Sequence, residues 1–363
     1  MLAGGAIVGG MIRLSVLDQS TVVSGRMPDT SIRESLELAR HCEALGYTRY
    51  WVAEHHNSDA QAGTAPEILI SAIAATTQRI RVGSAGVMLP HYSSLKIAEQ
   101  FRVLEAIAPG RIDLGLGRAP GSDGLTAFAL NPAANSAADH FPAQVRDVIA
   151  WSSGQPLVEG HPFRSVRAQP QGPTVPEVWI LGSSDYGAQV AAHFGLPYCF
   201  AAFITDGEGA AEAMALYRDN YKPSFRHPRP HGAVCIWAVA GETEEAAERL
   251  FSSRAMSRLA RDRGLVVALP SPEEAARHPF TASERTHVDR LKERGIWGTA
   301  AQVGTTLRTL AAELQVDEIA ILTTVHDPTA RRRSYTLLAE EFSLQAAPEM
   351  AGALAPLRFI ASA

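Results

Sequence analysis

Short apolar runs alternate with longer segments of helical periodicity along most of this chain. The first pair is a strand-like run at residues 12–18 and a segment at residues 31–47, in which apolar residues recur every three or four positions. Ser31 and Glu34 predict a capping box at the start of this helix, and Gly46 predicts a left-handed end. The pattern therefore predicts one strand followed by one helix.

The same pairing of strand and helix recurs seven more times. In the second pair, Thr64 and Glu67 predict another capping box, with Pro66 in the first turn of the helix. The further predicted pairs, strand first, are 50–53 with 64–78, 80–89 with 94–107, 111–117 with 137–152, 177–184 with 185–195, 196–203 with 207–221, 233–241 with 243–260, and 317–322 with 327–344. Because strands buried on both faces read as continuous apolar runs, eight such pairs predict an α/β protein with a closed (β/α)₈ TIM barrel.

Two stretches interrupt the repeat and are interpreted as loop insertions. Residues 154–176 are rich in Pro and Gly, and residues 264–298 are rich in charge and His. An extra helix is expected at residues 301–314, after the second insertion. We expect a single barrel domain over residues 11–345, with a disordered extension at residues 1–10 and a tail at residues 346–363.

Composition narrows the classes of function. The chain has 363 residues and a formal net charge of −5, and its Arg residues are scattered, so it lacks the basic stripe of a nucleic-acid-binding protein. Cys42, Cys199 and Cys235 lie far apart in apolar stretches, without metal-ligand spacing or a disulfide framework. The apolar start is too short to span a membrane and lacks the basic beginning of a signal peptide. These features favour small-molecule chemistry in the cytoplasm, without nucleic acid, membrane or metal.

A carboxylate and two histidines end the second predicted strand. In a barrel of this kind the active site lies at the carboxyl ends of the strands, so Glu54, His55 and His56 are expected at its rim. Successive side chains of a regular strand point to opposite sides. We therefore expect one of the two histidines to face the cavity and the other to be packed and hydrogen-bonded. The alternative is that both histidines are ordinary hydrogen-bonded residues that close the strand.

Turns rich in Gly and Ser follow two other strands. Arg118 follows Gly117 after the fourth strand, and Ser183 and Ser184 lead directly into the helix after the fifth. Exposed amides at a helix start, two hydroxyl groups and an arginine form a candidate phosphate site. Simple N-capping by one of the serines is the alternative.

Three stretches of the chain combine these features in one order and spacing. They are VAEHH at the end of the second strand, GSAGVMLPHYSSLKIAEQFRVLEAIAPGRIDLGLGRAPG across the third and fourth, and LGSSDYGAQVAAHFGLPYCFA at the fifth. Together they resemble the bacterial luciferase-like flavin monooxygenases, over residues 14–342. The resemblance is greatest to single-chain members that act on substrates other than long-chain aldehydes, such as polyketide-tailoring oxygenases.

The resemblance implies a cofactor, a reaction and site residues. Reduced FMN from a separate flavin reductase would react with O₂ to a C4a-hydroperoxide, which inserts one oxygen atom into an organic substrate. His55 matches the catalytic histidine, suited to acid–base duty near neutral pH. Ala85 and Gly86 match a turn, often with a non-prolyl cis peptide, against which the isoalloxazine ring packs. The residues that match phosphate contacts are Arg118, Ser183, Ser184 and Gly187.

The sequence departs from the family pattern at one point and leaves the substrate open. Some relatives offer a second phosphate arginine, but residues 131–140 contain none, which leaves His140 or Asn135 as substitutes. The insertion at residues 264–298 matches the region of a mobile lid, disordered without ligand. The candidate pocket residues are Trp51, Met88, His91, Phe203 and Trp237, which would favour a broad, partly aromatic substrate such as a polyketide.

We also expect a homodimer, and two other functions compete with the oxygenase. Family relatives pair through early helices, and the second helix offers Ile68, Ala72 and Ala75 for a homodimer. One competing function is a hydride-transferring oxidoreductase that uses a deazaflavin or bound FMN, and another is a non-catalytic flavin-binding protein. A metal-dependent hydrolase is disfavoured, because adjacent histidines on a strand cannot jointly bind one metal ion.

Overall fold

The computed structural model describes residues 12–346. The predicted N-terminal extension, and the predicted tail from residue 347 onward, lie outside these described residues.

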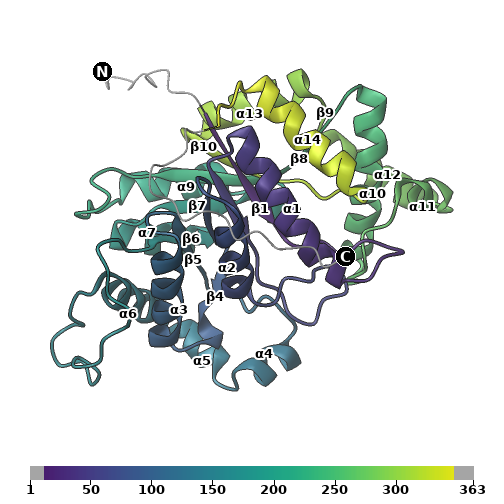
Figure 1. Cartoon of the computed structure of the whole chain (residues 1–363). Helices are drawn as coiled ribbons and strands as arrows, with labels where there is room; N and C mark the ends of the chain where they lie inside the picture. Colours follow the sequence, from purple (N-terminus) through teal and green to yellow (C-terminus); the bar gives the residue numbers. More distant parts are fainter. Residues whose placement is uncertain (1–11, 347–363) are drawn as a thin grey trace, which may run out of the picture.

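Eight parallel strands form a closed barrel in the described part of the chain (Figure 1). Closure is visible at Ile319, which lies opposite Leu14 on one side and Val234 on the other. Two further strands lie beside the barrel path, β4 (Val87–Met88) against β5 and β9 (Ile296–Thr299) against the end of β8. The barrel strands are β1 (Arg13–Asp18), β2 (Arg49–Val52), β3 (Arg81–Ser84), β5 (Ile112–Gly117), β6 (Glu177–Gly182), β7 (Tyr198–Ala201), β8 (Gly232–Gly241) and β10 (Glu318–Leu322). The predicted TIM barrel is confirmed.

Helices surround the barrel, with α1 packed between α2 and α14 (Figure 1). They bury the outward faces of the strands, which is why the strands read as continuous apolar runs in the sequence. The helices are α1 (Asp29–Leu45), α2 (Pro66–Thr76), α3 (Ser94–Ile107), α4 (Gly124–Leu130), α5 (Ala134–Asp139), α6 (Phe141–Ser153), α7 (Asp185–Phe194), α8 (Ala202–Thr205), α9 (Ala210–Asp219), α10 (Glu244–Asp262), α11 (Pro272–Arg277), α12 (Ala282–Arg294), α13 (Ala300–Leu314) and α14 (Pro328–Glu341), with a 3₁₀ turn at Leu89–His91.

The predicted capping boxes of the first two helices are wrong. Helix α1 begins two residues earlier than predicted, after Pro28, because the Ser31 hydroxyl donates to the carbonyl of Thr21 and Glu34 pairs with Arg26. Its predicted left-handed end at Gly46 is confirmed, with φ of 90°.

Helix α2 has Ala65 at its N-cap, again without a side-chain cap, although Pro66 occupies its first turn as predicted. Glu67 instead accepts a hydrogen bond from Gln100 of α3.

The two predicted insertions differ in structure. Residues 155–176 contain no helix or strand, as expected of a loop. Residues 264–298 are not a structureless loop, because they contain α11, α12 and most of β9. Helix α11 is capped by Ser271 with Glu274, and α12 by Thr281 with Glu284, each as a complete capping box.

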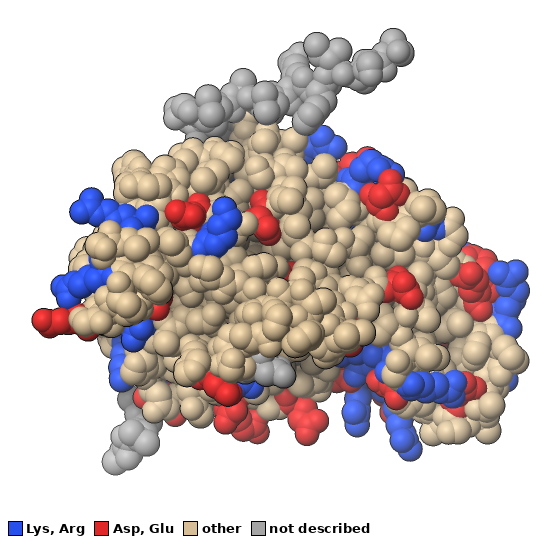
Figure 2. All heavy atoms as spheres, turned by 90° about the horizontal axis from the view of Figure 1, so that it is seen from below, with Lys and Arg blue, Asp and Glu red and all other residues tan. Residues whose placement is uncertain are grey.

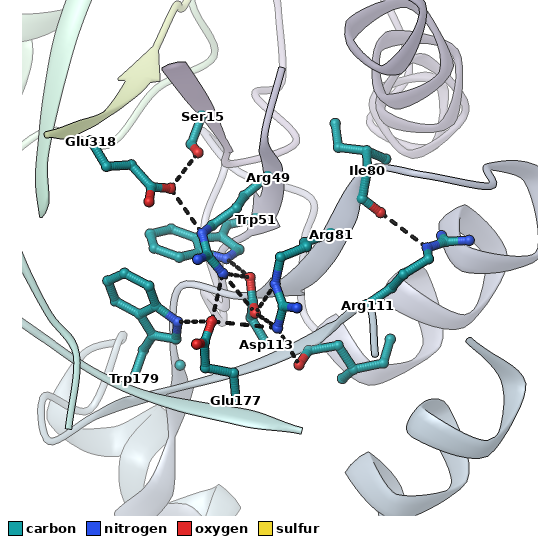
Figure 3. A network of polar contacts seen from close by, with 12 residues as sticks. Ser15, Arg49, Trp51, Ile80, Arg81, Arg111, Asp113, Glu177, Trp179 and Glu318 are labelled. Carbon is teal, nitrogen blue, oxygen red and sulfur yellow. Dashed lines mark hydrogen bonds and ion pairs between the residues drawn. The ribbon is translucent and has the colours of Figure 1, made fainter. Parts of the chain in front are cut away.

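A buried polar network closes the amino ends of the strands, opposite the end where the loops carry polar residues (Figure 3). Arg49 donates to Asp113, Glu177 and Glu318 at 2.8–2.9 Å, and Arg81 also binds Asp113. Burial raises the pKa of Glu177, but the charges of Arg49 and Arg81 outweigh it and bring that pKa to about 2. The network therefore fixes the bottom of the barrel in an ionised state and leaves the carboxyl ends of the strands for ligands.

The surface seen from below mixes acidic and basic side chains around broad uncharged areas (Figure 2). This face carries no patch of a single sign of the kind that attracts nucleic acid. Among the described residues, no helix is long and apolar enough to cross a membrane.

Candidate active site

A cavity of about 730 Å³ lies at the carboxyl ends of the barrel strands. This volume is within the range of small-molecule and cofactor sites. Residues after β1, β2, β3, β5, β6, β7 and β10 line it, together with one face of α10. All seven residues predicted for the site are among its lining: His55, Ala85, Gly86, Arg118, Ser183, Ser184 and Gly187.

His55 and His56 both line the cavity, so the expectation that only one would face it is wrong. Strand β2 ends at Val52, and the irregular backbone after it no longer alternates. His56 is hydrogen-bonded as expected, with Nε2 at 2.8 Å from Oε1 of Glu54. The fully buried Glu54 also accepts from the Tyr92 hydroxyl at 2.6 Å and from the amide of Met88 at 2.9 Å. Glu54 therefore anchors His56 and β4 beside the cavity.

His55 is held by its backbone rather than by its ring. Its amide donates to the carbonyl of Gly63 at 2.8 Å, whereas ring atom Nδ1 is buried without a hydrogen-bond partner in the described structure. Burial lowers the pKa of His55 to about 4; the charge of Glu54 opposes this shift, and His56 and Arg261 add to it. At neutral pH the imidazole is therefore uncharged, and one ring nitrogen donates while the other accepts.

Small residues form one wall of the cavity between β3 and β4. The Ala85–Gly86 peptide is cis, and it divides the single strand predicted at residues 80–89 into β3 and β4. A Cβ atom on Gly86 would come within 2.9 Å of the Gly115 carbonyl and of Leu181. Only glycine therefore fits here, and the small residues at this wall leave room for a flat group in the cavity.

Arg118, Ser183 and Ser184 lie around the start of α7. The exposed Arg118 guanidinium stacks on Tyr186 of α7, with 4.2 Å from Cζ to the ring centroid. Ser184 is the N-cap residue of α7, but its side chain makes no capping hydrogen bond, so simple N-capping does not account for it. Gly187 permits close approach in the first turn, where an added Cβ would be 3.3 Å from Tyr198. Free hydroxyls, helix amides and an arginine are donors that suit a phosphate.

The structure corrects part of the predicted substrate pocket. Trp51, Met88 and Phe203 line the cavity. His91 does not, because it is buried with Nε2 on the Pro120 carbonyl at 2.7 Å. Trp237 lies beneath α10, where its indole donates to Thr324.

Neither proposed replacement for the second phosphate arginine is supported. His140 does not line the cavity and joins the ends of α5 and α6. The side chain of Asn135 lies outside what the structure describes.

Sequence reasoning missed an arginine cluster on α10. Arg254, Arg258 and Arg261 line the cavity together with the apolar residues 265–267. Their spacing of four and three residues puts them on one face of a helix, so the sequence itself indicates that the three arginines lie side by side. The residues looked scattered only because the face of α10 that meets the barrel was unknown.

The family model of the luciferase-like monooxygenases matches residues 12–318, most of the chain. The chain belongs to the luciferase-like monooxygenase family. Within it, the N-acetyl-S-alkylcysteine monooxygenase of Bacillus subtilis is 34% identical over 330 residues, which cover 91% of this chain and 98% of that relative. The family resemblance inferred from the three sequence stretches is thus confirmed, and the chain is an enzyme of this family.

Solved structures agree with this membership. The crystal structure of apo-MsnO8 has 36% sequence identity and a TM-score of 0.83, covering 92% of this chain and 98% of that chain. The oxygenating constituent of 3,6-diketocamphane monooxygenase of Pseudomonas putida, solved in complex with FMN, has 16% identity and a TM-score of 0.68, with 92% and 98% covered. At this lower identity the likeness establishes the shared fold of the luciferase-like monooxygenases.

Proposed function

We propose that this protein is a reduced-FMN-dependent monooxygenase that activates O₂ and inserts one oxygen atom into an organic substrate. The observation that carries the proposal is the meeting of a phosphate-type donor set, a small-residue wall and an uncharged histidine in one cavity. Membership of the luciferase-like monooxygenases supports the reaction, and the related FMN complex supports the cofactor.

Arg118, Ser183 and Ser184 would bind the phosphate of FMN. Arg118 forms no hydrogen bond or ion pair with another described residue, so its donors are available. The first amides of α7 have no partner within the helix, which favours an anion there. Gly187 lets the first turn of α7 pack closely on Tyr198 and Gly182, which holds these donors at the edge of the cavity. A dianionic phosphate fits the charge and the donors of this end of the cavity.

Ala85 and Gly86 would support the isoalloxazine ring. Their side chains are small or absent, and the neighbouring Leu181 and Gly115 fill the space behind them. A flat ring can lie against this backbone without displacing a side chain. When bound, reduced FMN supplies the electrons for reaction with O₂.

His55 would act on protons beside this wall. Because its pKa is about 4, the ring is neutral at physiological pH, so one nitrogen can accept a hydrogen bond while the other donates one to a reacting group. Glu54 fixes the neighbouring His56 and Met88 at the end of β4, which keeps the surroundings of His55 in place. The apolar residues Trp51 and Phe203 would exclude water from the same space.

The proposal extends to substrate and partners. Trp51, Met88 and Phe203 favour a broad, partly aromatic substrate such as a polyketide. A separate flavin reductase would supply reduced FMN by diffusion. Location in the cytoplasm is supported by the described cysteines, all three of which are free and buried.

We also propose a homodimer through α2 and α3. Ile68 is 69% exposed on α2, and Val103 and Ile107 are 48% and 41% exposed on the neighbouring α3. Ala72 and Ala75 are partly exposed on α2, and their small side chains permit close approach of a second copy. Exposed apolar residues on adjacent helices are typical of a symmetric interface.

Stopped-flow absorbance tests the oxygenase function without a known substrate. Protein loaded anaerobically with reduced FMN is mixed with O₂, and the appearance of oxidised FMN is followed. We expect it to be delayed relative to free FMN, and Arg118→Ala to require more protein for the same delay. Arg33→Ala, on the outer face of α1, is the matched control. Oxidation at the rate of free FMN in the presence of saturating protein would contradict the proposal and favour hydride transfer or flavin storage.

A further inference from the structure

Three arginines of α10 project into the cavity at a distance in sequence from the phosphate-type residues. Arg254, Arg258 and Arg261 lie on the helix that follows β8, whereas Arg118 follows β5 and Ser184 precedes α7. In the barrel order β5, β6, β7, β8, the α10 arginines thus belong to a different sector of the cavity. The cavity therefore has two groups of positive charge.

Arg254 has a charge without an ionic partner. Its Cζ lies 4.4 Å from the ring centroid of Trp237, and it forms no hydrogen bond or ion pair with another described residue. Burial, together with the charge of Arg258, lowers the pKa of Arg254 to about 9, against the opposing charge of Asp206. The guanidinium is still charged at neutral pH, and an incoming anion would replace the hydration that it has lost.

Arg258 is only partly compensated. Nη2 donates to Asp206 at 2.9 Å, while Nε and Nη1 are buried and lack a hydrogen-bond partner among the described residues. Its Nε lies 3.5 Å from the Asp262 carboxylate, an ion pair without hydrogen-bond geometry. Arg261 is exposed at the mouth of the cavity and is close enough to His55 to lower its pKa. The cluster thus reaches from the interior to the surface of one side of the cavity.

The remaining lining does not neutralise this charge. Asp123 is the single carboxylate among the described lining residues, against four arginines. It is already engaged, because it caps α4 and accepts a hydrogen bond from Asn57. With Arg118 assigned to the flavin phosphate, the α10 arginines are left with no counter-ion on the cavity side.

We propose that Arg254, Arg258 and Arg261 bind an anionic group of the substrate, so that the natural substrate is an organic acid with an apolar, partly aromatic body. This inference rests on the proposed flavin function, because it assigns the phosphate to Arg118 and the substrate to the rest of the cavity. Trp51 and Phe203 also line the cavity and would receive the apolar body. A carboxylate is the simplest group that matches bidentate guanidinium donors.

Binding of matched acids and amides tests the proposal. The probes are phenylpropionate and octanoate, each compared with its own amide, titrated by calorimetry into protein saturated with FMN. We expect each acid to bind at least about tenfold more tightly than its amide, since charge-assisted contacts are lost with the amide. Arg254→Gln and Arg261→Gln should remove most of this preference, and Arg254→Lys should retain part of it.

Arg249→Gln is the matched control, because Arg249 is on α10 but faces outward to Glu273. It should leave the preference unchanged. Equal binding of acid and amide, no binding of either acid, or a preference that survives both glutamine variants would overturn the proposal.

The same variants distinguish failure of the anion site from failure of the proposed flavin site. Loss of FMN affinity in Arg254→Gln would assign the α10 arginines to the cofactor phosphate and also overturn the anion site. Preference for acids in a protein that fails the stopped-flow test would support the anion site and reject the oxygenase function.

Discussion

Replacing His55 by Gln should make the free energy of unfolding decrease less when the pH is lowered from 7 to 5. The unfolded imidazole binds a proton below about pH 6.5, whereas the folded one does so only below about pH 4. Within this window the unfolded state binds more protons, so the free energy of unfolding falls as pH falls. At pH 5, which is about 1.5 units below the pKa of the unfolded imidazole, each pH unit changes the free energy of unfolding by about 1.4 kcal/mol. The contribution of His55 between pH 7 and pH 5 is therefore at most about 2 kcal/mol.

Urea unfolding followed by tryptophan fluorescence measures this contribution at both pH values. Burial also lowers the pKa of His41 and His227, so the wild-type protein carries several acid-sensitive groups and the informative quantity is the difference between variant and wild type. The exposed His193→Gln variant of α7 controls for the loss of an imidazole as such. If His55→Gln lost as much stability on acidification as the wild type, the reasoning about the neutral, buried imidazole would be refuted.

Four further predictions follow from the site and the surface. Arg118→Ala should weaken binding of reduced FMN by about tenfold to a hundredfold, measured by anaerobic titration, and unchanged affinity would remove Arg118 from the site. His55→Ala should lower substrate oxygenation by about 10²–10⁴-fold while flavin binding is retained, whereas near-wild-type rates would reject its role. His56→Ala should destabilise the fold by about 1–3 kcal/mol, since Glu54 loses a buried partner, as seen in urea unfolding; unchanged stability would contradict this. Light scattering should give a dimer mass that Ile68→Asp reduces to a monomer, and a wild-type monomer would reject the interface.

The barrel was predictable because each strand is buried on both faces and each helix has one apolar face. β10 is fully buried and reads as EIAIL, and α3 begins and ends at the residues that periodicity predicts, Ser94 and Ile107. The carboxyl ends of the strands then had to converge, which brought Arg118 and Ser183 into one cavity despite their separation in sequence.

Local rules failed where tertiary contacts competed with them. The Ser31 and Glu34 pattern is a sound capping box, but their side chains bind Thr21 and Arg26 instead, and α1 begins before them. A short-range pattern does not contain such partners, which are brought close only by folding.

Other parts of the sequence carry patterns that indicate more of the structure. Glu274 and Glu284 each follow a Ser or Thr by three residues, which is the capping pattern of the two helices in the second insertion. The arginines of α10 have helical spacing, but their side of the helix can be assigned only when its packing on the barrel is known. The sequence pattern also does not determine the last residue of β2, and the positions of His55 and His56 depend on where this strand ends.

A crystal structure of the protein with bound FMN tests the central claim most directly. We expect the phosphate on Arg118, Ser183 and the start of α7, with the isoalloxazine ring against Ala85 and Gly86 and next to His55. A phosphate on the arginines of α10, or a flavin bound outside this cavity, would contradict it.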